Sequence, residues 1–228
     1  MKVIVSGASS GIGKELAIAF SKKGFDVLAI ARSKDKLQNL KLDYDKIQIL
    51  SCDLSKDESR DSFESALSAW EKIDIIINNA GQLLNKPFLE STTNDFLDMF
   101  NVNVLSSVRL IQWSYSRLEK SDSAHIVNIS SMGGFQGSSK FSGLSAYSSA
   151  KGALTILTEC IASETNESDI RVNALALGAV DTLMLNRAFP GYKAPLSPSK
   201  MASYIAEFAL SGGVYYHGKV LPVALGNP

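Results

Sequence analysis

Short apolar runs alternate along the chain with longer segments in which apolar residues recur at helical spacing. The short runs are apolar throughout, which is typical of strands that are buried on both faces of a parallel sheet. We expect strands at 3–6, 26–31, 47–52, 73–78, 125–130, 171–177 and 219–224, and helices at 12–23, 34–41, 56–71, 92–119, 146–165 and 199–210. This order predicts an α/β fold, a Rossmann-like doubly wound parallel sheet of about seven strands with helices on both faces.

Two local signals refine this pattern. Ser55 is followed three residues later by Glu58, which is the spacing of a capping box and predicts the start of the third helix. The segment 183–199 holds three prolines and shows no regular period, so we expect an ordered loop there rather than a linker. Residues 1–228 are therefore expected to form a single domain.

The composition suits a folded domain and argues against several function classes. Of the 228 residues, 45% are hydrophobic and 20% are charged, and 23 basic residues balance 23 acidic ones. Without net charge the chain has no field that attracts nucleic acid or an anionic membrane, so we expect neither partner. No apolar run approaches the ~20 residues that span a bilayer, and the chain begins on an apolar run with no charged leader. We expect a soluble, cytoplasmic protein whose two cysteines are reduced and buried.

A glycine-rich turn with Gly7, Gly11 and Gly13 lies between the first expected strand and the first expected helix. Glycine tolerates positive φ and lacks Cβ, so the backbone can turn sharply and approach a pyrophosphate, which the helix N-terminus would attract. A P-loop does not fit, because Ala8 stands where its first glycine would be and Glu15 replaces the hydroxyl that binds Mg²⁺. A tight turn without a ligand is the simpler alternative.

Tyr147 and Lys151 are four residues apart, so on a helix their side chains share one face. A phenol has a pKa of about 10, and an adjacent ammonium stabilises the phenolate and lowers that pKa. Tyr147 would then exchange a proton with a reacting oxygen at neutral pH. A surface pair on an amphipathic helix is the alternative.

Polar residues also stand where two further strands end, at Asn79 and Ser131. Ligands of open α/β sheets bind at the carboxyl ends of the strands, although Ser131 could equally be a strand-end cap. Asn103 lies in a helical segment, where asparagine is unfavourable. Either a specific role or a bond to its own backbone would explain it.

Together the glycine-rich turn, Asn78-Asn79-Ala80-Gly81, Asn103, Ser131 and Tyr147-x-x-x-Lys151 resemble, in order, the motif set of the classical short-chain dehydrogenases/reductases. The resemblance is close over 3–182 and looser beyond. It implies that Tyr147 is the acid/base and that Lys151 lowers its pKa and binds the nicotinamide ribose. Ser131 would bond the substrate oxygen, and Asn103 would hold a water in a proton relay. The cofactor-binding residues that it implies are Gly7, Ser9, Ser10, Gly11, Ile12, Gly13, Arg32, Ser33, Asp53, Leu54, Asn79, Ala80, Gly81, Tyr147, Lys151, Val180 and Thr182.

The chain departs from the family pattern at three places. Leu177-Gly178 stands where many members have Pro-Gly. The loop 132–146 is longer than in many members, which indicates an insertion beside the pocket. The segment 183–199 is short for the family, so the substrate lid is abbreviated, and we expect it to be the most mobile part of the chain without cofactor.

The resemblance implies an NADP(H)-dependent oxidoreductase that interconverts a small-molecule carbonyl compound and a secondary alcohol. A catalytically silent sensor or scaffold of the same fold is one alternative, and a lyase or epimerase of the superfamily is another. His125 and His217 lack a nucleophile elbow, and with Cys52 and Cys160 they lack the spacing of metal ligands. We therefore expect neither a hydrolase nor a metal site.

The end of the second expected strand favours NADP(H) and leaves NAD(H) open. NAD enzymes usually carry an acidic residue about 20 residues past the glycine turn, and Ala31 stands there, eighteen positions after Gly13. Arg32 and Ser33 follow, and a guanidinium with a hydroxyl suits a 2′-phosphate. An Arg32 stacked on the adenine would serve either cofactor.

A homodimer or homotetramer is also expected. The helices near 103–119 and 146–165 carry apolar residues that suggest a symmetric interface, and the resemblance points the same way. The apolar residues in question are Leu110, Trp113, Leu157 and Ile161.

Overall fold

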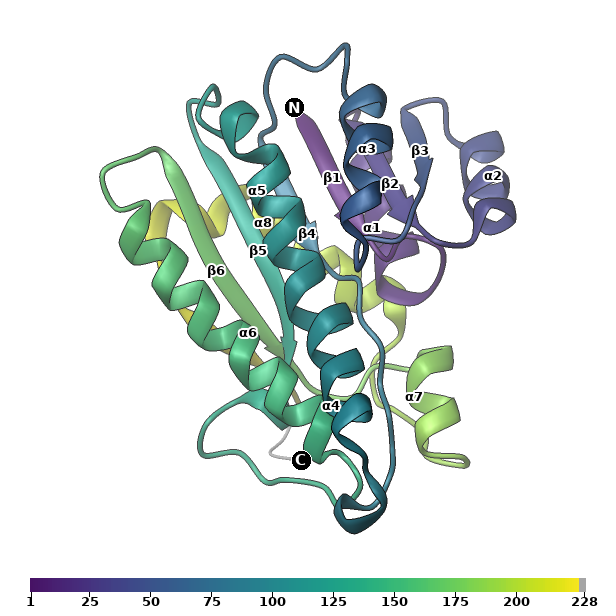
Figure 1. Cartoon of the computed structure of the whole chain (residues 1–228). Helices are drawn as coiled ribbons and strands as arrows, with labels where there is room; N and C mark the ends of the chain where they lie inside the picture. Colours follow the sequence, from purple (N-terminus) through teal and green to yellow (C-terminus); the bar gives the residue numbers. More distant parts are fainter. Residues whose placement is uncertain (226–228) are drawn as a thin grey trace.

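The computed structural model describes residues 1–225, and in them seven parallel strands form one sheet (Figure 1). The strands are β1 (Lys2–Ser6), β2 (Asp26–Ala31), β3 (Ile47–Ser51), β4 (Ile75–Asn78), β5 (Ala124–Ser131), β6 (Ile170–Leu177) and β7 (Val220–Val223). Their order is β3-β2-β1-β4-β5-β6-β7, so the chain reverses its direction of travel across the sheet between β1 and β4. The predicted fold class is confirmed, and a ligand is expected at this reversal, outside the carboxyl ends of the strands.

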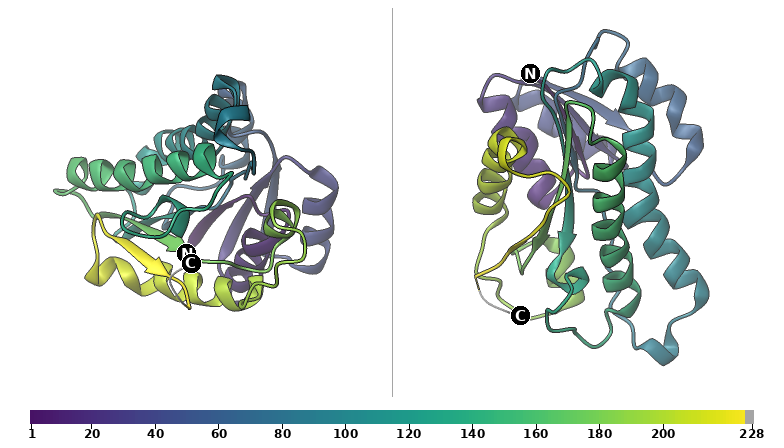
Figure 2. Two further views of the ribbon diagram at one scale, coloured as in Figure 1. Left: turned by 90° about the horizontal axis from the view of Figure 1, so that it is seen from below. Right: turned by 90° about the vertical axis from the view of Figure 1, so that its left-hand side faces the viewer.

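Helices cover both faces of the sheet (Figure 2). They are α1 (Gly11–Lys22), α2 (Lys34–Asp43), α3 (Arg60–Ala66), α4 (Thr93–Phe100), α5 (Ser106–Leu118), α6 (Ser145–Glu164), α7 (Leu183–Ala188) and α8 (Pro198–Tyr215). α1 and α8 pack side by side on one face, and α3, α5 and α6 cover the other. α7 lies beyond the sheet, near the carboxyl ends of the strands.

The core follows from the alternation of side chains along each strand. In β1, Val3 and Val5 join the apolar cluster under α1 and α8, whereas Ile4 joins the cluster on the opposite face. Phe20 of α1 is fully buried in the first cluster. Its truncation to alanine would cost about 3–5 kcal/mol of stability, and this packing holds α1 against the sheet.

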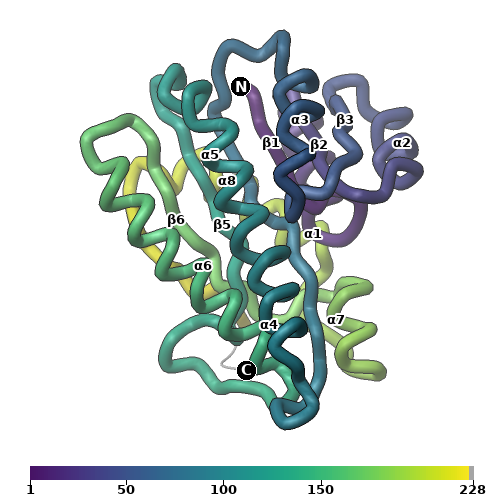
Figure 3. The backbone as a smooth tube through the Cα atoms, viewed as in Figure 1, coloured from purple at the N-terminus to yellow at the C-terminus, as the bar shows by residue number. Residues whose placement is uncertain are grey.

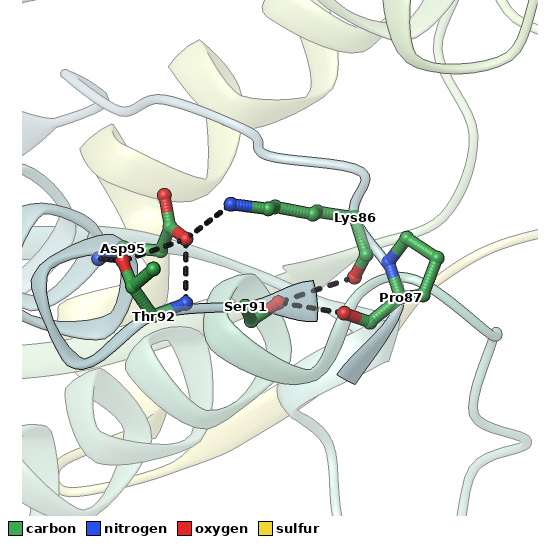
Figure 4. Close-up of polar contacts among 5 residues, drawn as sticks. All are labelled: Lys86, Pro87, Ser91, Thr92 and Asp95. Atoms are coloured by element: carbon green, nitrogen blue, oxygen red, sulfur yellow. Dashed lines mark hydrogen bonds and ion pairs between the residues drawn. The ribbon is translucent and has the colours of Figure 1, made fainter. Parts of the chain in front are cut away.

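The predicted helix 56–71 is shorter than expected and has no capping box. The Ser55 hydroxyl and backbone N–H both donate to Asp53 Oδ1, at 2.7 and 3.0 Å. Asp53 therefore engages Ser55 before a helix can begin, and the chain passes through a 3₁₀ turn (Asp57–Ser59) into α3. A capping box does form at the start of α4, between Thr92 and Asp95 (Figure 4).

The predicted helix 92–119 is interrupted. Between α4 and α5 the chain forms a π-helical segment (Asn101–Leu105), which widens the turn around Asn103. A π-bulge inside a helix frequently marks a functional position. The position of Asn103 in a helical segment, where asparagine is unfavourable, therefore indicated this interruption of the helix.

Two expectations about surface and core were wrong. Leu110 and Trp113, chosen as interface residues, are buried in the core beneath α5. Cys160 is exposed and Cys52 is half-buried, so the cysteines are free, as expected, but not buried. Within residues 1–225, no helix is long and apolar enough to cross a membrane.

Candidate active site

A cleft of about 1100 Å³ lies along the carboxyl ends of β1, β2, β4 and β5. Every residue that the sequence predicted for the site lines this cleft except Gly13, which is buried behind the glycine-rich turn. The strand ends therefore bring together residues from both halves of the chain. The volume is that of a ligand site for a molecule larger than a typical drug.

The glycine-rich turn has the shape that a bound pyrophosphate needs. Gly7 and Gly11 have φ of +69° and +55°, which other residues rarely adopt. A Cβ on Gly13 would overlap the carbonyl oxygen of Gly7 and the amide of Asn79. In α1 no side chain caps the N-terminus, so its first N–H groups remain available to an anion in the cleft.

Ser6 and Asn79 join this turn to the end of β4. The backbone N–H groups of Asn79 and Ala80 both donate to Ser6 Oγ, at 3.0 and 2.9 Å. Asn79 Nδ2 donates to the carbonyl oxygen of Ser6 at 3.0 Å. The Asn79 side chain thus serves the backbone of the turn, which is a positioning role that the motif alone did not reveal.

Tyr147 and Lys151 lie one turn apart on α6, beside Ser131 at the end of β5. Lys151 is 4% exposed, its Nζ donates to the carbonyl oxygen of Ile129 at 2.8 Å, and it lies 6.0 Å from the centre of the Tyr147 ring. Burial lowers the pKa of Lys151 to about 8. The backbone of β5 therefore fixes the ammonium in the cleft.

The pKa of Tyr147 does not follow the sequence-based expectation. Burial raises the pKa of its phenol, and the neighbouring Ser131 hydroxyl offsets part of that rise. Lys151 was expected to lower the pKa of Tyr147, but its ammonium is hydrogen-bonded to Ile129 instead. With the groups of this chain alone, the phenol is therefore protonated at neutral pH.

Asn103 is fully buried and holds the backbone after β4. Its Nδ2 donates to the carbonyl oxygens of Gln82 (3.0 Å) and Met99 (2.9 Å), and its Oδ1 accepts from Gln82 N–H (3.2 Å). Both donors of the amide are used, while Oδ1 keeps a second lone pair. Gly81 separates Asn103 from Lys151, because a Cβ on it would lie 2.9 Å from Asn103 Oδ1 and 3.4 Å from Lys151 Nζ.

The other end of the cleft, at β2, is basic. Arg32, Ser33 and Lys36 line it together with Asp53. Burial alone would raise the pKa of Asp53, but the hydrogen bonds from Ser55 lower it. The positive charges of Arg32 and Lys56 lower it further, so the pKa of Asp53 is lowered overall. Lys36 was missed from the sequence; its position one helical turn after Ser33 was the available signal.

The three-loop end of the cleft, beyond Tyr147, is formed by the loops 82–85 and 141–144 and by the connection 183–189. The expectation of a loop throughout 183–199 was wrong, because Thr182 caps a short helix, α7, in this connection. The side chains that these three segments place in the cleft are mostly apolar. They include Leu83, Leu84, Phe141, Leu144, Met184 and Phe189. Asn85 and Arg187 are polar residues of this end that sequence reasoning missed, since neither belongs to a recognisable motif. Among residues 1–225 no cluster of three or more His, Cys, Asp or Glu side chains is arranged to hold a metal ion.

The comparisons with known proteins agree with this geometry. The sequence model of the short chain dehydrogenase family matches residues 1–193. An uncharacterised oxidoreductase of Staphylococcus aureus (strain MW2) is 27% identical over 205 residues, covering 89% of this chain and 87% of the relative. A tropinone reductase homolog of Arabidopsis thaliana, described as chloroplastic, is 29% identical over 241 residues, covering 98% and 74%.

Solved structures show the same fold. L-sorbose reductase from Gluconobacter frateurii, complexed with NADPH and L-sorbose, matches with a TM-score of 0.87 at 24% identity, covering 99% of this chain and 95% of that one. ElxO with NADP bound matches with a TM-score of 0.85 at 26% identity, covering 98% and 96%. A 3-ketoacyl-(acyl-carrier-protein) reductase from Brucella melitensis, complexed with NADH, gives 0.87 at 24%, covering 99% and 97%.

A parallel sheet with a glycine-rich turn and a cleft at its reversal point defines a dinucleotide-binding enzyme class. Within that class the chain belongs to the classical short-chain dehydrogenases/reductases. It is an oxidoreductase that acts on CH–OH and C=O groups.

Proposed function

We propose that this enzyme interconverts a carbonyl compound and a secondary alcohol with NADP(H), and that Ser131, Tyr147 and Lys151, assisted by Asn103, carry out the chemistry. The observation that carries the proposal is the fixed Lys151 ammonium, 6.0 Å from the centre of the Tyr147 ring, in a cleft shared with Ser131. A protein that only binds a nucleotide has no need of this acid/base pair, so the geometry argues against a silent sensor.

The cleft fits a nicotinamide dinucleotide. The glycine-rich turn would hold the pyrophosphate, because Gly7 and Gly13 leave no room for a Cβ and the N-terminus of α1 faces the same space. Asp53 and Leu54 would meet the adenine, Asn79–Gly81 its ribose, and Val180 and Thr182 the carboxamide. When bound, the nicotinamide supplies the two-electron redox chemistry.

In the reduction direction Tyr147 would act as the proton donor. Burial keeps its phenol protonated, so it can transfer a proton to the substrate oxygen. Ser131 would donate a hydrogen bond to the same oxygen, and the Lys151 ammonium would stabilise the resulting phenolate and bind the nicotinamide ribose. The free lone pair of Asn103 Oδ1 would accept a hydrogen bond from a water that returns the proton.

The basic end of the cleft supports NADP(H) over NAD(H). Ala31 offers no carboxylate to a ribose 2′-hydroxyl, whereas Arg32, Ser33 and Lys36 present two cations and a hydroxyl to a 2′-phosphate. Two structural relatives were solved with NADPH or NADP and one with NADH. NAD(H) is therefore the second candidate cofactor.

The apolar lining of the three-loop end supports a small carbonyl compound with apolar substituents rather than a polyhydroxylated sugar. A sugar would need several hydrogen-bonding partners, and desolvating unpaired hydroxyl groups against Leu84, Leu144 and Met184 would be costly.

We further propose that residues 1–228 form one NAD(P)-binding domain.

The decisive experiment measures turnover of matched pairs of apolar ketones and sugars with NADPH and NADH, followed by nicotinamide absorbance, alongside cofactor binding. Turnover of apolar ketones is expected. Cofactor binding without turnover of any carbonyl compound or alcohol would refute the proposed function and favour the silent binder. Turnover of sugars but not of apolar ketones would refute only the proposed substrate class and would leave the proposed reaction standing.

A further inference from the structure

The lid segment, which is residues 183–195 of the stretch 183–199, makes a hydrogen bond to a distant part of the chain. Its backbone hydrogen bonds stay within residues 181–196, Thr182 caps α7, and Asn186 Nδ2 donates to Asp181. Within residues 1–225, one hydrogen bond alone joins this segment to a distant part of the chain, from Asn85 Nδ2 to the carbonyl oxygen of Ala188 at 2.8 Å. No salt bridge among the described residues involves the segment.

This bond spans the three-loop end of the cleft. Asn85 and Ala188 both line the cleft, one from the connection after β4 and the other from the end of α7. Figure 3 shows this connection running alongside α7. The position of the lid relative to the opposite wall therefore depends on one side-chain amide and on apolar packing.

Asn85 also touches the third loop. Gly143 has φ of +82°, and a Cβ on it would overlap Asn85 Oδ1, so a glycine is needed there on two grounds. The next residue, Lys86, donates its backbone N–H to the carbonyl oxygen of Gly143 at 2.8 Å. The amide of Asn85 is thus held between the lid and the 141–144 loop.

The turn that carries Asn85 is fixed by a network of polar contacts (Figure 4). Lys86 Nζ donates to Asp95 Oδ2 at 2.7 Å, and the same oxygen accepts from Thr92 N–H and Oγ1. Ser91 Oγ donates to the carbonyl oxygens of Lys86 and Pro87. The hydrogen bond from Lys86, helped by Thr92, lowers the pKa of Asp95 to about 2, so this network keeps its charge across the neutral range.

We propose that Asn85 is the positioning residue that latches the lid over the bound substrate. A pre-organised turn presents its Nδ2 to Ala188, so closing the lid costs little additional ordering. The bond is exposed and competes with water, so it can break when substrate enters and re-form afterwards. Asn85 then governs substrate affinity and leaves cofactor binding at the glycine-rich turn unaffected. The kinetic part of this inference rests on the proposed function.

Two substitutions distinguish a latch from simple packing. Asn85→Ala removes the donor, whereas Asn85→Asp keeps the shape beside Gly143 but sets a carboxylate oxygen against the carbonyl oxygen of Ala188. A latch predicts that KM for the carbonyl substrate rises roughly three- to tenfold in Asn85→Ala and further in Asn85→Asp, with kcat reduced less and cofactor affinity unchanged. A packing role predicts that Asn85→Asp is the milder change, and that order would overturn the proposal.

Matched variants and a second measurement distinguish a failure of the latch proposal from a failure of the proposed function. Asn94→Ala and Asn94→Asp make the same changes at an exposed residue of α4 and should leave KM unchanged. Amide exchange in 184–189 needs no substrate and should speed up in both Asn85 variants but not in the Asn94 variants. Equal exchange in all of them would refute the latch. Faster exchange in a protein that turns over no carbonyl compound would uphold the latch and refute the proposed function.

Discussion

Lys151 Nζ lies 6.0 Å from the centre of the Tyr147 ring while donating a hydrogen bond to the carbonyl oxygen of Ile129. The ammonium is thus anchored to β5 and not to the phenol itself. Burial keeps the Tyr147 phenol protonated. The Lys151 ammonium, which would stabilise a phenolate, is held at a fixed position beside it. This arrangement favours proton donation to a substrate oxygen, and the first two predictions test it.

Tyr147→Phe should abolish turnover and leave cofactor affinity within a few-fold, because the ring stays and the proton donor is lost. General acid catalysis typically contributes at least about a hundredfold. Steady-state kinetics and cofactor titration would check this, with Tyr192→Phe as control, since Tyr192 lines the same cleft and is exposed. Residual activity above about a tenth of wild type would sink the acid/base role.

Lys151→Ala should lose both turnover and cofactor affinity, since one ammonium is assigned to the phenolate and to the ribose. The change also leaves the carbonyl oxygen of Ile129 without its partner, which costs about 1–3 kcal/mol of stability. Cofactor titration is therefore paired with urea denaturation, so that weak binding is not confused with unfolding. Full cofactor affinity in a folded variant would rule out the ribose role.

A third prediction concerns acid stability. His125 is buried, its Nδ1 contacts the carbonyl oxygen of Ala209 (2.9 Å) and its Nε2 contacts Asn173 Nδ2 (3.0 Å). Because Asn173 Nδ2 is a donor, Nε2 must accept, so the ring is neutral with its proton on Nδ1. Burial is the main cause that lowers the pKa of His125 from 6.5 to about 4.

The unfolded chain therefore binds this proton more readily than the folded one. The stability from His125 is complete above pH 6.5 and is lost as the pH falls toward about 4. The loss approaches about 3 kcal/mol. Urea denaturation at several pH values should show this fall in stability in wild type and strongly reduced in His125→Gln. In His217→Gln the fall should be only slightly smaller, because the charge of His217 is the smallest cause of the lowered pKa of His125. An unchanged fall in His125→Gln would assign the pH dependence to other groups.

The parts of the molecule that could be predicted from sequence were those with local signals. The strand ends carried their polar residues next to them in the chain, so the glycine-rich turn and Ser131 could be assigned to one cleft. Tyr147 was added by its helical spacing from Lys151 and by the order of the family motifs. The capping box predicted from Ser55 and Glu58 was wrong, because the Ser55 hydroxyl donates to Asp53, two residues earlier, and does not cap a helix. Asn85 gave no local signal at all, since its partner Ala188 lies 103 positions away and offers only a backbone carbonyl.

The homodimer or homotetramer remains a prediction, on different residues from those first chosen. Leu110 and Trp113 stabilise the monomer core, whereas Ile156 on α6 and Leu97 and Phe100 on α4 are exposed. Light scattering at micromolar concentration should give a multiple of the chain's 24.6 kDa. Ile156→Glu should shift the mass toward the monomer if α6 forms the interface, and a monomeric wild type would contradict the prediction outright.

The last prediction concerns the choice of cofactor at the end of β2. Arg32 lines the cleft beside Ser33, so a 2′-phosphate placed there would accept charge-assisted hydrogen bonds from both. Arg32→Ala should weaken NADPH binding by about 1.5–3 kcal/mol, the scale of a hydrogen bond to a charged group, and should barely alter NADH binding. Lys34→Ala is the matched control, because Lys34 begins α2 and is not part of the cleft lining, whereas Lys36 is.

Ala31→Asp tests the same site from the other side. A carboxylate there would accept hydrogen bonds from the ribose 2′-hydroxyl of NADH and would repel a 2′-phosphate. The ratio of kcat/KM for NADPH and NADH should therefore move toward NADH, and Ala31→Asp combined with Arg32→Ala should move it further. If Arg32 merely stacks on the adenine, Arg32→Ala would weaken both cofactors alike. A wild-type kcat/KM that is higher with NADH than with NADPH would refute the assignment of NADP(H), because it would mean that Arg32 and Lys36 contribute nothing selective to the 2′ position.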